Sequence, residues 1–171
     1  MNDGDSAAFY SREAFGERLG GFIYGTIVVL SAVIAGSRIY PHAPAHVATF
    51  VVVATLVLWL AHVYAHTVTF SVTHDQHLSR AEVGHVARQE ASILEAGVPS
   101  VVALLLGVVG LLSEDVSIWL AFGLGVGVLA VQGFVFARVE RLGPAATAAV
   151  VALNLGLAVL LIWLKLLVGH H

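Results

Sequence analysis

Two histidines four residues apart inside an apolar run are the first residues whose types and spacing could do chemistry. The stretch WLAHVYAHTVTF, residues 59–70, contains His62 and His66. Residues at i and i+4 lie on the same face of a helix, so the two imidazoles are expected to be neighbours. An imidazole exchanges a proton near neutral pH and also binds metal ions. The spacing therefore predicts a proton-exchanging pair or two ligands of a metal.

A carboxylate is expected at the depth of these histidines. With a rise of about 1.5 Å per residue, His66 and Glu95 each lie about 12 Å from the centre of their apolar segment, and His62 about 6 Å. A His–Glu pair between the two segments is the resulting prediction. Other polar residues within the apolar segments are expected at a similar level, as hydrogen-bonding partners of the pair: Tyr24, Ser92, Gln132 and Asn154.

This polar cluster has four interpretations. It could be a buried hydrogen-bond network that only fixes the packing of helices. His62, His66 and Glu95 could line a pathway for protons or small cations, because ionisable groups inside a membrane usually face a cavity. The same three residues could bind a divalent metal, and His66 with His85 could bind a haem. Ion movement is the leading functional prediction, and the alternatives for the whole protein are an accessory subunit of a membrane complex or a metal-binding membrane protein.

The segments that carry these residues are typical of membrane helices. The chain has 171 residues, of which 58% are hydrophobic and 11% charged, whereas soluble domains have about 25% charged residues. Crossing the hydrocarbon takes roughly 20 apolar residues, and only a helix satisfies its own backbone there. The sequence predicts an all-α polytopic bundle, a single integral membrane domain over residues 1–171. Its five expected transmembrane helices cover about 19–37, 46–70, 92–112, 116–137 and 145–168.

The distribution of arginines predicts the orientation. Six arginines fall on one side of the five segments (Arg12, Arg18, Arg80, Arg88, Arg138 and Arg141), and only Arg38 falls on the other. Cytoplasmic loops carry the excess of basic residues, so the N-terminal segment 1–18 and the loop 71–91 are expected in the cytoplasm and the C-terminus outside. The loop is predicted to form a short amphipathic helix that starts at a Ser79–Glu82 capping box and continues into the third segment. Together with the apolar segments, this distribution predicts a multi-pass protein of the cell membrane.

Composition also bears on cofactors and partners. There is no cysteine and the formal net charge is −3, so thiolate metal sites are excluded and nucleic acid is not expected as a partner. The sequence contains neither H-E-x-x-H nor G-x-S-x-G, so an enzyme is not favoured. No cofactor is predicted beyond the divalent metal. Gly21 with Gly25 and Gly123 with Gly127 allow helices to approach closely, inside one bundle or between the subunits of a predicted homo-oligomer.

The first apolar segment carries a family resemblance. RLGGFIYGTIVVL, residues 18–30, resembles the first helix of the endolysosomal potassium and proton leak channels and their prokaryotic relatives. Arg18 and Phe22 match the spacing of that family's Arg and Phe-Ser-Asp motif, while Ile23 and Tyr24 replace its Ser and Asp. Trp59 and His62 resemble a Trp and His in the family's second helix. The resemblance implies a multimeric pore lined by the first helix, with an apolar constriction at Ile27 or Leu30, although the family has six helices per repeat.

Overall fold

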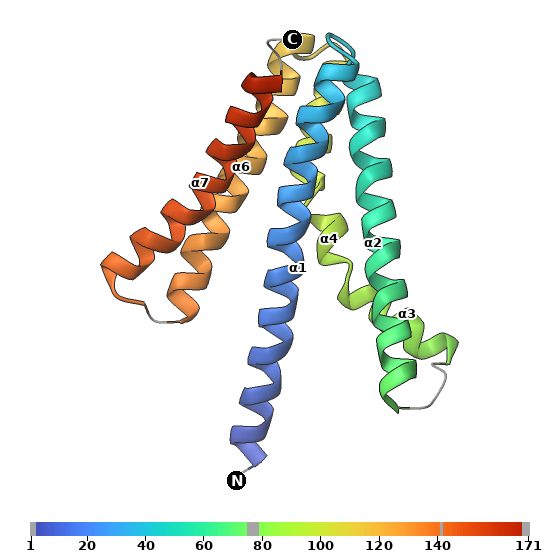
Figure 1. Ribbon diagram of the computed structural model, residues 1–171, viewed down its shortest axis with the longest axis vertical. Coiled ribbons are helices and arrows are strands. Elements are labelled where there is room, and N and C mark those ends of the chain that lie inside the picture. The colour runs from blue at the N-terminus through green and yellow to red at the C-terminus, as the bar shows by residue number, and fades with distance from the viewer. Residues whose placement is uncertain (1–2, 75–78, 141, 169–171) are drawn as a thin grey trace.

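The chain folds as a bundle of helices in a computed structural model (Figure 1). The structure describes residues 3–74, 79–140 and 142–168, and these contain no strand, which confirms the all-helical prediction. The elements in chain order are α1 (Asp3–Ile39), α2 (Pro44–His74), α3 (Arg80–Gln89), α4 (Ser92–Glu95), α5 (Val98–Val108), α6 (Glu114–Val139) and α7 (Pro144–Val168). Of the nine histidines, His77, His170 and His171 lie outside the described residues.

Several of these helices are long and apolar enough to cross a membrane. Arg18–Ile39, Pro44–Val72 and Glu114–Val139 each meet that requirement on their own. Arg80–Glu95 together with Val98–Val108 meets it as a fourth span, bent by 53°. Within α7, the described apolar portion is the shorter Pro144–Gly156. Three or four such helices indicate an integral membrane protein, and the fifth span stays a prediction.

The third segment is broken, and the prediction of one continuous helix from the loop into this segment was wrong. α3 ends at a cap on Glu90, and a single turn, α4, follows before α5 begins after Gly97. Pro99 occupies the first turn of α5, where its missing N–H costs nothing but a continuous helix would lose a hydrogen bond. The bend at this break turns α3 and α4 away from the axis of α5.

The core lies where α1, α2, α5 and α6 meet. It consists mainly of fully buried aliphatic side chains from these four helices: Val29, Leu30, Val33, Val47, Val51, Leu104 and Leu129. Glycines let the helices approach closely. A Cβ on Gly125 of α6 would lie 2.6 Å from Leu30 Cδ2, and a Cβ on Gly25 of α1 would lie 2.9 Å from the backbone of Ile93. These approaches bring α1 against both α6 and α4.

The helices alternate in direction along the bundle. Figure 1 shows α1 beginning at one end and α7 finishing at the other. The connection after α1 turns through His42, which has φ of 58°, and Pro44 starts α2. After α5 ends at Val108, the chain turns through Gly110, with φ of 77°, and Ser113 caps α6 by accepting a hydrogen bond from the Val116 N–H. Both of these connections lie at the end of the bundle opposite the start of α1 (Figure 1).

Candidate functional site

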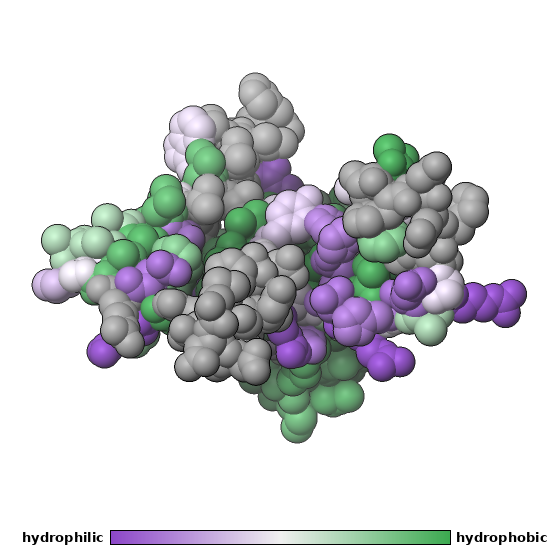
Figure 2. Space-filling view, turned by 90° about the horizontal axis from the view of Figure 1, so that it is seen from below, coloured by the Kyte–Doolittle hydropathy of each residue, from purple (hydrophilic) through white to green (hydrophobic). Residues whose placement is uncertain are grey.

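A polar pocket of about 730 Å³ lies between α1, α2 and α3, at the end of the bundle where α1 begins. Apart from two glycines, every residue of its lining has a side chain that titrates or forms hydrogen bonds. The lining consists of Arg18, Gly20, Gly21, Tyr24, His62, His66, His85, Arg88, Gln89 and Glu90. Figure 2 views the molecule from that end and shows hydrophilic side chains gathered there beside hydrophobic ones. The His66 side chain is 52% exposed, so the cavity is open at this residue.

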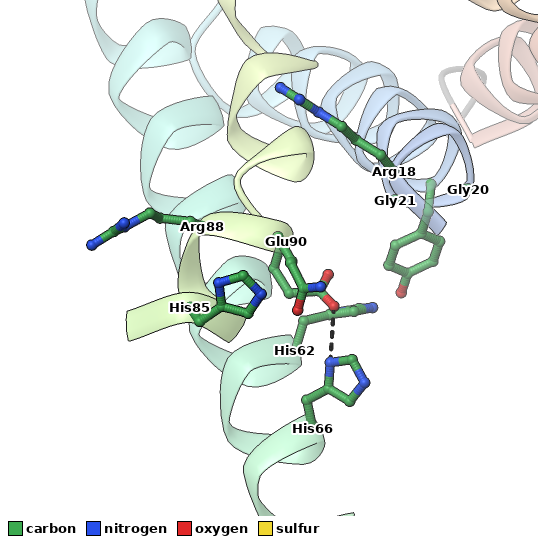
Figure 3. Close-up of a pocket in the computed structure, with 10 residues that line it drawn as sticks. Arg18, Gly20, Gly21, His62, His66, His85, Arg88 and Glu90 are labelled. Carbon is green, nitrogen blue, oxygen red and sulfur yellow. Dashed lines mark ion pairs between the residues drawn. The ribbon is translucent and has the colours of Figure 1, made fainter. Parts of the chain in front are cut away.

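The pocket contains a His–Glu ion pair, but the carboxylate is Glu90. His66 Nδ1 lies 3.2 Å from Glu90 Oε1, and Figure 3 shows this contact as the dashed line. The Glu90 side chain is only 18% exposed, because it follows the last turn of α3 and points back toward α2. The pair therefore joins α2 to the bend that separates α3 from α4. At 3.2 Å the carboxylate and the imidazole are within the reach that direct proton transfer needs.

His62 lies one helical turn earlier on α2 and faces α1. Its ring centroid lies 5.2 Å from that of Tyr24, with the rings tilted by 45°. His62 Nδ1 lies 3.3 Å from the Leu58 carbonyl oxygen, which leaves Nε2 for the pocket. His85 adds a third imidazole from α3, and Figure 3 shows it beside Glu90. Three helices thus bring three imidazoles, a phenol and a carboxylate to one cavity.

Local interactions hold α3 in place. The Ser79 backbone N–H donates to Glu82 Oε2 at 2.6 Å and the Glu82 N–H donates to Ser79 Oγ at 3.3 Å, which confirms the predicted capping box. These hydrogen bonds from Ser79 hold the pKa of the exposed Glu82 carboxyl below its usual value. Trp59 Nε1 of α2 donates to the Ala87 carbonyl oxygen at 3.0 Å. The helix that carries His85 and Arg88 is therefore fixed at its start and along its length.

A second, mostly apolar pocket adjoins the first. It measures about 460 Å³ and lies between the C-terminal part of α2 and one face of α3, lined by His66, Phe70, Ala81, Glu82, His85, Val86 and Gln89. Its lining shares three residues with the polar pocket: His66, His85 and Gln89. The two cavities thus meet along one face of α3.

Glu95 does not join the histidines. Its carboxylate accepts two hydrogen bonds from Arg18 Nη2, at 3.0 and 3.2 Å, and it does not line the polar pocket. The chain turns at Glu90 and Ala91 between α3 and α4, so that Glu95 lies beside α1 and Glu90 beside α2. The predicted metal ligands were His62, His66 and Glu95, and the structure does not bring these three side chains together. No group of three or more His, Asp or Glu side chains within the described ranges could hold a metal ion.

Three further predicted polar partners lie in the helix packing and not in the pocket. Ser92 is buried against Gly21 of α1. Gln132 Nε2 donates to Thr26 Oγ1 at 3.3 Å, and its Oε1 is buried without a partner. Asn154 Nδ2 donates to the Leu129 carbonyl oxygen at 3.3 Å. Of the predicted polar set, only Tyr24 joins the two histidines.

The two predicted constriction residues, Ile27 and Leu30, pack into the core of the helix bundle. Leu30 is fully buried in the core under Gly125. Ile27 is partly buried against the same core. A pore formed by several copies of α1 would therefore not be lined by Leu30, because this side chain already fills the space between α1 and α6.

Sequence reasoning missed the partner of His66. Glu90 lies in a polar connection, and a continuous helix would have placed it beyond the end of the bundle. Gly97-Val98-Pro99 predicts the break before α5, because a glycine and a proline two residues apart interrupt a helix. Neither glycine nor proline marks the turn at Glu90 and Ala91 that positions the partner of His66. Comparisons with protein-family models, with characterised proteins and with solved structures find no match to this chain. The resemblance to the leak channels therefore depends on the residues of the first two spans alone.

Proposed function

We propose that this integral membrane protein moves protons, and that the pocket between α1, α2 and α3 is where protons enter from the cytoplasmic side. The observation that supports the proposal is the His66–Glu90 pair, at 3.2 Å, in an open cavity that also contains two further imidazoles. Imidazole is the side chain whose ordinary titration falls between pH 5 and 8, so it loads and unloads protons at physiological pH. Ionisable groups in membrane segments usually mark such pathways.

Protons fit the lining better than metal cations do. Glu90, the one carboxylate of the lining, is already engaged by His66, and the Glu95 carboxylate is held by Arg18 outside the lining. A hard metal cation binds several oxygen ligands, and this lining offers it no free carboxylate. A proton is instead passed along hydrogen bonds and is held on a ring nitrogen. We therefore assign the uptake step to His66 with Glu90 and the next position to His62 with Tyr24.

The proposed route continues into the core. Thr26 lies two residues beyond Tyr24 on α1 and accepts the hydrogen bond of Gln132, and Asn154 supplies another buried amide. Beyond them the buried side chains of Val29, Leu30 and Val33 close the way to the opposite end. Passage across the membrane therefore requires the helices to separate there. In this proposal the described arrangement is the state open to the cytoplasmic side only.

Proton flux into liposomes tests the proposal. Purified full-length protein would be reconstituted, a potassium gradient with valinomycin would drive proton entry, and a pH-sensitive dye would report it. Replacing both pocket histidines (His62→Gln with His66→Gln) is expected to lower the flux at least tenfold. The matched control replaces His42 and His46, which are exposed at the opposite end. Wild-type protein without flux above empty liposomes would refute the function, and an unaffected double variant would remove these residues from the route.

The proposal includes five spans, a cytoplasmic N-terminus and self-association. Because the chain has no cysteine, single introduced cysteines report sidedness cleanly. Leu111→Cys is expected to react with an impermeant maleimide on whole cells, and Gly143→Cys only after permeabilisation; the reverse pattern contradicts the orientation.

A Cβ on Gly123 or Gly127 would meet nothing within 4 Å in the chain, so these positions are free to meet a second copy. A Gly127→Cys variant that forms no disulfide-linked dimer in membranes counts against that contact.

A further inference from the structure

We propose that Trp59 is the positioning residue of the proton uptake pair, because its indole N–H satisfies the end of α3 at the turn that directs Glu90 toward His66. The effect of Trp59 on proton movement rests on the proposed function. Its effect on the position of Glu90 does not, because that position depends only on how α3 packs against α2.

The local sequence does not explain why α3 ends where it does. Residues 88–91 read Arg-Gln-Glu-Ala, which are all good helix formers, and no glycine or proline lies among them. Such a run favours a helix that continues, yet α3 ends at Gln89 and Glu90 is its C-cap. A contact from another part of the chain therefore has to stabilise the turn.

The indole of Trp59 supplies such a contact. The last four carbonyl groups of a helix find no N–H donor within that helix. In a helix that continued, the Ala91 N–H would donate to the Ala87 carbonyl oxygen, but it donates to the Arg88 carbonyl oxygen at 3.3 Å instead. Trp59 Nε1 donates to the Ala87 carbonyl oxygen at 3.0 Å and takes the place of that backbone donor. Trp59 and Ala87 are both half-buried, so water replaces this hydrogen bond only in part.

The turn at the end of α3 sets the direction of Glu90. Its ψ is −3°, whereas an α-helix has about −42°, so the chain leaves the helical path at this residue. The Glu90 carboxylate lies 3.2 Å from the imidazole of His66, as Figure 3 shows. Trp59 and His66 are seven residues apart and lie on the same face of α2. One face of α2 thus supplies both the donor that ends α3 and the imidazole that meets Glu90.

Loss of the indole donor has a defined consequence. The Ala87 carbonyl oxygen can then accept the Ala91 N–H, and α3 continues in α-helical geometry through Glu90. That change of backbone conformation turns the Glu90 carboxylate away from His66. Trp59 therefore acts on the uptake pair through Glu90 and not by touching the proton itself.

Cross-linking measures the position of Glu90 independently of proton movement. Because the chain has no cysteine, His66→Cys with Glu90→Cys introduces the only two thiols, and a short bismaleimide is expected to join them. Adding Trp59→Phe, which keeps an aromatic ring and removes the N–H, is expected to slow this reaction at least fivefold. Trp163→Phe, at an exposed position of α7, is the matched control and is expected to leave the rate unchanged. A rate in Trp59→Phe equal to that of the control, or no cross-link in any of these proteins, would overturn the inference.

A double-mutant cycle in the liposome assay tests the effect on proton movement. Trp59→Phe and Glu90→Gln are each expected to lower the flux at least threefold. The double variant is expected to lose about as much as Glu90→Gln alone, because Trp59 acts through Glu90. Losses that multiply, or full flux in Trp59→Phe, would overturn the assignment of Trp59 to the uptake pair. Wild-type protein without flux would refute the proposed function, and the cross-linking rate would still decide whether Trp59 positions Glu90.

Discussion

Replacing Gly25 by alanine is expected to destabilise the protein, although alanine is the better helix former. A Cβ at this position would lie 2.9 Å from Ile93 Cα, 2.9 Å from Ile93 O and 3.1 Å from Ala96 Cβ. Two of these three atoms belong to the backbone of α4, so no side-chain rotation relieves the contact. Overpacking of this kind costs typically 1–3 kcal/mol. The gain in helix propensity, about 0.4–1 kcal/mol, offsets only part of that cost.

The net expectation is a loss of about 1–2 kcal/mol in the free energy of unfolding. Gly20→Ala in the same helix is the matched control, because a Cβ there meets nothing within 4 Å and is expected to stabilise by up to about 1 kcal/mol. Gly21→Ala should fall between the two, since its Cβ would lie 2.7 Å from the Ser92 hydroxyl, which can rotate away.

Equilibrium unfolding in mixed micelles of dodecylmaltoside and SDS, followed by the fluorescence of the three tryptophans, measures these differences. The expected order of stability is Gly20→Ala, wild type, Gly21→Ala, Gly25→Ala. The reasoning would be refuted by a Gly25→Ala protein as stable as the wild type, because α4 would then not lie against α1 as described. Equal losses at Gly20 and Gly25 would point to backbone flexibility in α1 instead of packing as the cause.

Two further predictions concern buried and capping polar groups. Gln132→Met is expected to leave the free energy of unfolding unchanged or to raise it by up to about 1 kcal/mol, because Gln132 Oε1 has no partner and the Thr26 hydroxyl keeps its bond to the Phe22 carbonyl; a loss above 1 kcal/mol in the same assay contradicts this. Folding lowers the pKa of Glu82 from 4.5, so the capping box stabilises α3 above that pH and this contribution is lost as the pH falls through the lowered value. Amide exchange of α3 should therefore accelerate on acidification in the wild type, and an identical acceleration in Glu82→Gln would exclude the cap as the cause.

The class of protein and several local features were predictable from the order of residues. Long apolar segments in a chain with few charges require helices, since no other open structure satisfies the backbone in lipid. The capping box at Ser79 and Glu82 was predictable because it depends on residues three apart in one helix. The same holds for the shared face of His62 and His66, both of which line the polar pocket. All of these features depend on short-range geometry, which neighbouring residues specify.

Which side chains meet across the bundle depends on the packing of the helices. His66 pairs with Glu90 and Glu95 with Arg18, because the chain turns at Glu90 and Ala91 between α3 and α4 and the two carboxylates face different helices. Equal depth in separate segments did not bring His66 and Glu95 together, since depth says nothing of rotation about a helix axis or of a 53° bend. Packing also placed Gln132 and Asn154 in the core and not at the pocket. Contacts between distant residues depend on how helices turn toward one another, and a single sequence does not specify that rotation.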